Sequence, residues 1–387
     1  MADTTRSWNY ALGRNDSIVQ EGTVNGANII VVDEDLTPGN EYSYIVYFLM
    51  NNEIADSSNI VDLTTQPSEE FLGLDGKLIT HLAIIQNHLY TGTLYEGLWR
   101  LDIMSDLSQW EYLGFSNTEV GYDKYSISDI VQNRDNHDEI LVVGPTNRYS
   151  IPGVFKSRDG GASWNISDEG AGSFPSKQKF QVLDDRILAW GSSGPWFSTD
   201  FGDHWSFDSS VVTAGGFKNI DAFEKHETID THLWLAGDDF YMVGHLLKSI
   251  DSGTEWISIP FDDQLIFGIR SIALHPTNTE IIYIVTSGDI YKATDGGEFW
   301  MQSGLNAATP ITHSQLSTAT EIVIDSSNPD HLIAAGGNRL FETFDAADTW
   351  KELMTIIPVE DFITGLRYNA GTKQLYVATN SGVYVQR

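Results

Sequence analysis

The chain has 387 residues, 41% of them hydrophobic, which is enough to bury a sizeable core in one large all-β domain or in two or three smaller domains. Its 54 Asp and Glu residues outnumber its 22 Lys and Arg residues, which gives a net charge of -32. A surface so negative repels phosphate backbones and anionic lipid headgroups, so we expect neither nucleic acid nor a membrane surface as a partner. Because the acidic residues are dispersed, they favour a role in solubility over cation binding.

The sequence contains no cysteine, which removes disulfides, zinc-thiolate sites and thiol catalysis together. Its first ten residues, MADTTRSWNY, have no apolar stretch of the kind found in signal peptides. No run approaches the ~18 apolar residues of a membrane span. We therefore expect no membrane insertion, and we interpret the chain as a mature form or a piece of a longer protein.

Residues 1–67 differ from the rest and form the first predicted domain. Period-2 alternation predicts strands over 29–32 and 42–48, separated by the Pro-Gly turn of LTPGNEYSYIVYFL. In this stretch Leu36, Pro38 and Tyr42 resemble the tyrosine corner of fibronectin type III domains, and SSNIVDLTTQP resembles the last strand of such a module. Such domains run to roughly 100 residues, so the resemblance implies a small, incomplete β-sandwich. We expect it to act as a spacer.

A short segment recurs through residues 68–387, the second predicted domain. KSRDGGASW at 156–164 returns as FSTDFGDHW at 197–205, KSIDSGTEW at 248–256, KATDGGEFW at 292–300 and, in degenerate form, ETFDAADTW at 342–350. The aspartates of successive segments are 41, 51, 44 and 50 residues apart. Each interval holds four short strand-like runs without helical periodicity. Four strands in a period of ~40–50 residues are typical of a β-propeller.

We predict seven blades, near residues 78–115, 127–168, 179–210, 218–259, 268–303, 319–354 and 362–387. The last range supplies three strands, so its fourth has to come from elsewhere in the chain. SEEFLGL at 68–74 is the natural donor, because a closed ring leaves no exposed sheet edge. The predicted fold is therefore all-β, a seven-bladed β-propeller closed by an N-terminal strand, with six or eight blades as the alternatives.

The recurring Ser-x-Asp-x-Gly-x-x-Trp pattern resembles the Asp-box, or bacterial neuraminidase repeat, of sialidases, xyloglucan-cleaving glycoside hydrolases, sortilin-type receptors and photosystem II assembly propellers. Its residues here are Ser157, Asp159, Gly161 and Trp164; Ser198, Asp200, Gly202 and Trp205; Ser249, Asp251, Gly253 and Trp256; Asp295, Gly297 and Trp300; and Asp345 and Trp350. Ala293 replaces Ser in the fourth copy and Ala347 replaces Gly in the fifth.

The residue types of the box suit a turn. Asp and Ser side chains bond nearby backbone amides, Gly tolerates positive φ, and Trp provides a large buried anchor. The resemblance places this hairpin between the third and fourth strands of a blade, at the rim of the ring. We therefore interpret the box as structural and not catalytic.

Families of this shape place their sites at one mouth of the central channel. A glycosidase needs two carboxyl groups there, one on each side of the scissile bond. The loops expected at that mouth offer four weak catalytic candidates, Asp123, Asp262, Glu360 and Asp361. Exposed aromatics such as Tyr95 could instead stack on sugar rings, whereas Trp196 is expected to pack between blades. The segment YSIPGVF has Ser150 where sialidases carry an arginine, which argues against that family.

We expect no cofactor and no metal. The ten histidines are scattered, and the spacing of His226 and His232 fits surface histidines better than metal ligands. Calcium stays open as the alternative, although no acidic turn has the ligand spacing of a Ca²⁺ loop and no motif therefore supports it. No phosphate-binding glycine loop opens a helix.

The sequence favours a secreted or cell-envelope propeller, monomeric, that binds or scaffolds a glycan or a protein at one face of the ring. The alternative is a polysaccharide-cleaving enzyme, sialidase-like or xyloglucanase-like, with carboxylates at the channel mouth. Converging carboxyl groups with a perturbed pKa would favour the enzyme. Exposed aromatic faces without such acids would favour binding.

Overall fold

The computed structural model describes residues 7–15, 17–25, 41–50, 53–57, 61–64, 69–105, 109–116, 127–144, 153–171, 179–190, 196–208, 219–229, 231–238, 244–259, 268–286, 289–303, 320–353 and 355–386. Those ranges contain strands and turns and no helix, which confirms the predicted all-β class. In the same ranges, no helix capable of crossing a membrane is present. The chain divides into two compact units, one of residues 1–69 with 386–387 and one of residues 70–385.

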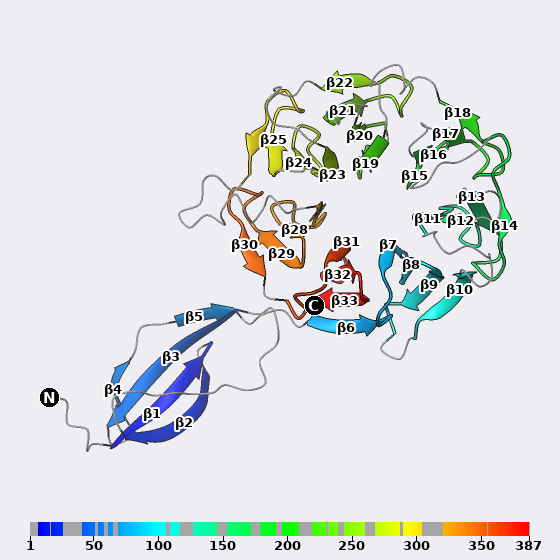
Figure 1. Ribbon diagram of the computed structural model, residues 1–387. Coiled ribbons are helices and arrows are strands. Elements are labelled where there is room, and N and C mark those ends of the chain that lie inside the picture. Colours follow the sequence, from blue (N-terminus) through cyan, green and yellow to red (C-terminus); the bar gives the residue numbers. More distant parts are fainter. Residues whose placement is uncertain are drawn as a thin grey trace. The chain divides into compact units, whose positions relative to one another are not determined.

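The first unit contains one five-stranded sheet, drawn in blue in Figure 1. Its strands are β1 (Ser7–Arg14), β2 (Ser17–Asn25), β3 (Glu41–Met50), β4 (Glu53–Ser57) and β5 (Val61–Thr64). They pair in the order β2-β1-β3-β4, and β5 also pairs with β3. The predicted strand over 42–48 lies within β3. The other predicted strand and the tyrosine-corner residues Leu36 and Pro38 lie outside the described residues, as does the side chain of Tyr42.

In the second unit, the described strands form seven four-stranded sheets. The first three sheets contain β7 (Ile79–Ile85), β8 (His88–Thr93), β9 (Glu96–Asp102) and β10 (Glu111–Ser116); β11 (Asp129–Gln132), β12 (Ile140–Gly144), β13 (Gly153–Ser157) and β14 (Asn165–Ile166); and β15 (Lys179–Val182), β16 (Ile187–Trp190), β17 (Trp196–Ser198) and β18 (Ser206–Phe207).

The next three sheets contain β19 (Asn219–Lys225), β20 (Leu233–Asp238), β21 (Gly244–Ser249) and β22 (Ile257–Ile259); β23 (Ile269–Leu274), β24 (Ile282–Thr286), β25 (Ile290–Ala293) and β26 (Met301–Gln302); and β27 (Glu321–Ile324), β28 (Leu332–Gly336), β29 (Arg339–Thr343) and β30 (Lys351–Leu353). The last contains β31 (Ile363–Asn369), β32 (Gln374–Thr379), β33 (Val383–Gln386) and β6 (Glu69–Gly73).

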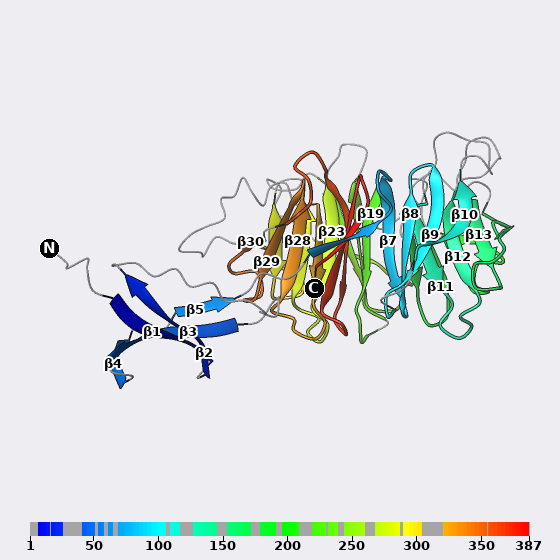
Figure 2. The same ribbon diagram turned by 90° about the horizontal axis from the view of Figure 1, so that it is seen from below.

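The seven sheets stand in a ring with the first strand of each sheet innermost, as the labels β7, β11, β15, β19, β23 and β31 show in Figure 1. Figure 2, from the side, shows the strands running roughly along the ring axis, so that the connecting loops gather on two opposite faces. This arrangement is a β-propeller. The seven first strands therefore surround one axis.

The N-terminal strand β6 lies beside β33 as the fourth strand of the last sheet. The rings of Phe71 on β6 and Tyr384 on β33 are 5.1 Å apart. A buried apolar cluster that includes Ile79, Leu82 and Val383 joins this sheet to the first one. The two ends of the ring are thus tied together both by strand pairing and by apolar packing.

A buried apolar cluster fills each interface between neighbouring sheets. Second strands lie in the middle of this packing, and every residue of β12, β24 and β28 is buried. Such strands are continuous apolar runs because a neighbouring sheet covers each of their two faces. The short fourth strands lie at the rim and expose more of their side chains, as in β14 and β18.

The recurring box forms the turn between the third and fourth strands of its sheet. In the first copy, the Ser157 hydroxyl donates to Asp159 Oδ1 at 2.7 Å and accepts the Gly161 N–H at 2.8 Å. Asp159 Oδ1 also accepts the Ser163 N–H at 2.8 Å. The Ser163 hydroxyl donates to Asp159 Oδ2 at 2.5 Å, and this bond, together with the others, holds the pKa of Asp159 down, at about 2. Every partner lies within a few residues, so the turn is set by local sequence.

In some copies of the box, the tryptophan also donates a hydrogen bond to the preceding sheet. Trp164 Nε1 donates to the Leu113 carbonyl and Trp205 Nε1 to the Ser167 carbonyl, both at 2.9 Å. In the first sheet, where the box is degenerate, Trp110 Nε1 donates to the Leu72 carbonyl of β6 at 2.9 Å. In these sheets the indole links the rims of neighbouring sheets, whereas Trp256 and Trp300 donate to the Gly253 and Gly297 carbonyls of their own turns, both at 3.0 Å.

Candidate functional site

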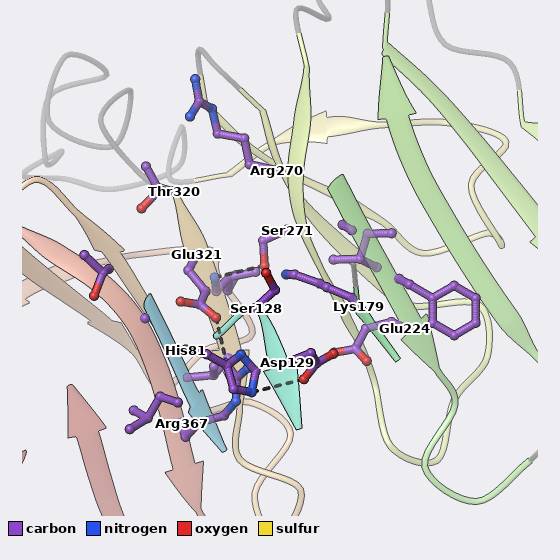
Figure 3. Close-up of a pocket in the computed structure, with 18 of the residues that line it drawn as sticks. His81, Ser128, Asp129, Lys179, Glu224, Arg270, Ser271, Thr320, Glu321 and Arg367 are labelled. Atoms are coloured by element: carbon purple, nitrogen blue, oxygen red, sulfur yellow. Dashed lines mark hydrogen bonds and ion pairs between the residues drawn. The ribbon is translucent and has the colours of Figure 1, made fainter. Parts of the chain in front are cut away.

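A cavity of about 490 Å³ lies on the ring axis, lined by the first strands of all seven sheets. Its charged lining residues are His81, Asp129, Lys179, Glu224, Arg270, Glu321 and Arg367. Hydroxyl groups are contributed by Thr80, Ser128, Ser271, Thr320 and Thr364. Figure 3 shows how these side chains converge from different strands. The cavity is therefore hydrophilic, although apolar interfaces surround it.

Asp129 is a buried carboxylate at the start of β11. Its Oδ2 accepts the backbone N–H of Phe180, on the neighbouring β15, at 2.6 Å, and its Oδ1 accepts the N–H of Ile130 at 2.8 Å. His81 Nε2 lies 3.0 Å from Oδ1, an ion-pair distance without the alignment of a good hydrogen bond. Burial works to raise the pKa of Asp129, but the charge and contact of His81 and the Phe180 N–H outweigh it, so the pKa lies below its ordinary value. Asp129 is thus an ionised link between sheets.

The same kind of link recurs around the ring. Glu321 Oε2, on β27, accepts the Leu366 N–H of β31 at 2.8 Å, and its Oε1 lies 2.8 Å from Arg367 Nη1. Ser271 Oγ, on β23, accepts the Ile322 N–H of β27 at 3.3 Å. In each case a side chain of one first strand satisfies a backbone donor of the next. Asp129, Ser271 and Glu321 therefore hold neighbouring sheets at a fixed separation around the axis.

Glu224, on β19, is a carboxyl group of a different kind. It is half-buried in the cavity wall, and burial raises its pKa to about 7. The positive charges of Arg367 and Lys179 and the backbone N–H of Lys225 oppose this rise, while the charge of Glu321 adds to it. Lys179, on β15, has an exposed side chain that points into the cavity in Figure 3. Near neutral pH, Glu224 can therefore hold or release a proton beside a lysine.

The cavity thus combines the ionised Asp129, the ion pair of Glu321 with Arg367, the Glu224 carboxyl group with a pKa of about 7, and further basic side chains. Groups with perturbed pKa values in a concave site are candidates for binding or acid–base chemistry. Among the described residues, no group of three or more His, Asp and Glu could hold a metal ion. The chemistry available to these residues is hydrogen bonding, charge pairing and proton transfer.

The four catalytic candidates of the sequence do not lie in the described cavity lining. Asp123 and Asp262 lie outside the described residues. Glu360 is exposed, in the segment between β30 and β31. The carboxylate of Asp361 accepts hydrogen bonds from Asn380 Nδ2 at 3.2 Å and from Ser381 Oγ, both in the turn between β32 and β33. Asp361 therefore ties two connections together, which fits a structural role better than a catalytic one.

Two of the aromatic residues and one histidine singled out in the sequence can be compared with their positions in the structure. Tyr95 is exposed. Trp196 is partly buried and packs against the apolar cluster between the second and third sheets, as expected, and its ring also lies 5.3 Å from that of Phe207 on β18 of its own sheet. His226 is buried, so the expectation of a surface histidine is wrong there. Its ring lies 6.4 Å from that of His232 because their β-turn brings the two ends of the hairpin together.

Sequence reasoning missed Asp129, Lys179, Glu224, Glu321 and Arg367. The available signal was polar residues inside otherwise apolar first strands, as in SDIVQ and TEIVI. Such a residue on a half-buried strand would normally be assigned to the solvent face. In a ring, that face of the innermost strand borders the channel instead.

No protein-family model matches the chain. Among curated proteins, the chain is 22% identical over 279 residues to the xyloglucanase Xgh74A of Acetivibrio thermocellus. The aligned region covers 60% of this chain and 33% of that protein. The chain thus spans about a third of the length of this relative.

Two solved structures have the same fold over most of the chain. YCF48 from Cyanidioschyzon merolae is 14% identical with a TM-score of 0.61, over 82% of this chain and 98% of that one. YCF48 bound to D1 peptide is 12% identical with a TM-score of 0.58, over 84% of this chain and 96% of that one. At these identities the similarity shows the β-propeller fold alone.

Proposed function

We propose that this protein is an extracellular glycan-binding β-propeller whose sugar site is the cavity on the ring axis. The observation that carries the proposal is a cavity of about 490 Å³, lined by charged groups and hydroxyls from all seven first strands. This volume lies within the ~300–1,000 Å³ range of small-ligand sites. Charged and hydroxyl side chains match the donors and acceptors of a sugar. The sequence similarity to a xyloglucanase supports a polysaccharide as the partner.

Binding fits the cavity better than hydrolysis does. Glycosidases use a pair of carboxyl groups, one as acid and one as base or nucleophile. In the described lining, Asp129 and Glu321 are both committed to backbone donors of neighbouring sheets. Using either carboxylate as a base or nucleophile would disturb the contact that holds the ring together. Glu224 remains as a carboxyl group suited to contact a ligand.

A second candidate function is glycoside hydrolysis at the same cavity, favoured by one observation. A carboxyl group with a pKa of about 7, Glu224, lies in the same cavity as the ionised Asp129. Carboxyl groups whose surroundings push their pKa values apart mark the acid and the base of such enzymes. In this scheme Glu224 would protonate the leaving oxygen and Asp129 would stabilise positive charge on the sugar ring.

Binding and hydrolysis are separated by two assays on the purified chain. A glycan array identifies bound sugars, and a reducing-end assay on xyloglucan and other polysaccharides detects cleavage. We expect binding that Lys179→Met weakens and that Lys351→Met, on the exposed outer strand β30, leaves unchanged. Absence of any bound glycan would overturn the proposal. Release of reducing ends that Glu224→Gln abolishes would establish the second candidate instead.

We further propose the finer architecture that the sequence suggested. The seven sheets are the seven blades of one closed ring, the recurring turns are structural Asp-boxes, and the N-terminal sheet is a fibronectin-like spacer. A polysaccharide partner supports a secreted or cell-envelope location. The protein would act as a monomer without metal or cofactor, which light scattering and metal analysis would test.

A further inference from the structure

The charges that line the cavity are not evenly paired. Arg367 is paired with Glu321, and His81 lies at ion-pair distance from Asp129. Lys179 makes no ion pair within 4.0 Å among the described residues, and its long side chain reaches into the cavity in Figure 3. Arg270 lines the same cavity from β23. Asp129 and Glu321 thus each have a basic neighbour, whereas Lys179 remains available to a ligand.

Glu224 adds a second group that suits an anion. When protonated, a carboxyl group donates one hydrogen bond, and an ionised acceptor makes such a bond short and strong. Its ionised form would repel an anion placed beside it. A lysine that supplies charge and a carboxyl group that supplies a proton therefore form a complementary pair for a carboxylate.

We propose that the cavity recognises the carboxylate of an acidic sugar, a uronic acid unit, which binds between Lys179 and the protonated side chain of Glu224. The proposal names the ligand class of the sugar site proposed above and rests on that function. The net charge of -32 does not oppose it, because charges more than ~8 Å apart across water are largely screened at physiological salt. At the site itself, the charges of the neighbouring groups determine whether an anion binds.

Binding should therefore be linked to proton uptake. The groups that face Glu224 are Lys179 on β15, Arg367 on β31 and Glu321 on β27, and Asp129 and His81 line the wall of the same cavity. Burial raises the pKa of Glu224 to about 7, so the side chain is mostly protonated at pH 6 and mostly ionised at pH 8. If the protonated form alone binds, the apparent Kd is inversely proportional to the population of that form, so the Kd rises about ten-fold as this population falls about ten-fold between pH 6 and pH 8.

The test is isothermal titration calorimetry with glucuronate and glucose, which differ only in the carboxylate, at pH 6 and pH 8. We expect glucuronate to bind at least ten-fold more tightly than glucose at pH 6, and about ten-fold more weakly at pH 8 than at pH 6. Lys179→Met should weaken glucuronate binding at least ten-fold. Glu224→Gln should remove the pH dependence, because the amide is a donor at every pH. Lys351→Met is the matched control.

The outcomes separate this proposal from the one on which it rests. Equal binding of glucose and glucuronate, or glucuronate binding that does not change with pH in the unmodified protein, would overturn the acidic-sugar site and leave glycan binding standing. Binding of a short peptide with a free C-terminal carboxylate, with no binding of its amidated form or of either sugar, would overturn both and indicate a protein partner.

Discussion

Replacement of Glu224 by Gln should stabilise the protein, although the residue lies in the proposed site. Raising a carboxyl pKa from 4.5 to about 7 disfavours the ionised form by up to ~3 kcal/mol. Because the group is half-buried and borders a hydrophilic cavity, we expect water to screen part of this penalty. Glu224→Gln should then raise the free energy of unfolding by ~1–2 kcal/mol.

The sign of this effect depends on pH. A carboxyl group whose pKa is raised in the folded state favours folding fully below its unfolded pKa, and this contribution is lost as pH rises through about 7. Glu224→Gln should therefore match the unmodified protein near pH 4.5 and exceed it at pH 8. The measurement is urea unfolding at both pH values, followed by tryptophan fluorescence and compared as a difference in the free energy of unfolding.

Asp129→Asn is the matched control, because it changes a carboxyl group of the same cavity with the opposite expected result. Its carboxylate accepts two backbone N–H groups, and its pKa is lowered, so ionisation stabilises the fold above pH ~4. Asp129→Asn should lower the free energy of unfolding by ~2–3 kcal/mol at pH 8. A gain for Glu224→Gln of equal size at both pH values, or no gain at pH 8, would refute the reasoning about its protonation.

Three further outcomes follow from the described contacts. Ala293→Ser should raise the free energy of unfolding by ~1 kcal/mol in urea titrations, because the hydroxyl would accept the Gly297 N–H as serines do in other copies of the box. Lys156→Met should lower it by ~1–3 kcal/mol, since the buried Lys156 Nζ lies 3.2 Å from Asp203 Oδ2 of the next turn, and full stability would contradict this link. Glu360→Ala should leave calorimetric glycan binding unchanged, and a loss would return this exposed residue to the site.

Glu224 links the stability of the fold to the proposed binding site. Glu224 costs stability at neutral pH, and the proposed site uses it as a proton-carrying donor. Residues that destabilise a fold while serving a site are a recurring compromise in proteins. If Glu224→Gln stabilises the fold and removes pH-dependent binding together, both effects have the same cause, the ionisation of one half-buried carboxyl group.

The sequence by itself determined the parts of the fold that depend on close neighbours. The box could be identified because its bonds are local, as between Ser157 and Gly161, four residues apart. The four strands of each repeat could be recognised because the runs are short and show no helical periodicity. The donor strand at 68–74 was identified because the last range lacked a fourth strand and a closed ring leaves no exposed sheet edge.

Only the tertiary structure decided where the candidate site lies. Asp129 and Phe180 are 51 residues apart, and Glu321 and Leu366 are 45 apart, so nothing in their local sequence shows that they meet. Their contact depends on the angle between neighbouring sheets and on closure of the ring. The raised pKa of Glu224 likewise depends on burial and on charges from β15, β27 and β31. Ring closure brings these distant strands to one axis, and there the polar residues of the first strands become the lining of a cavity.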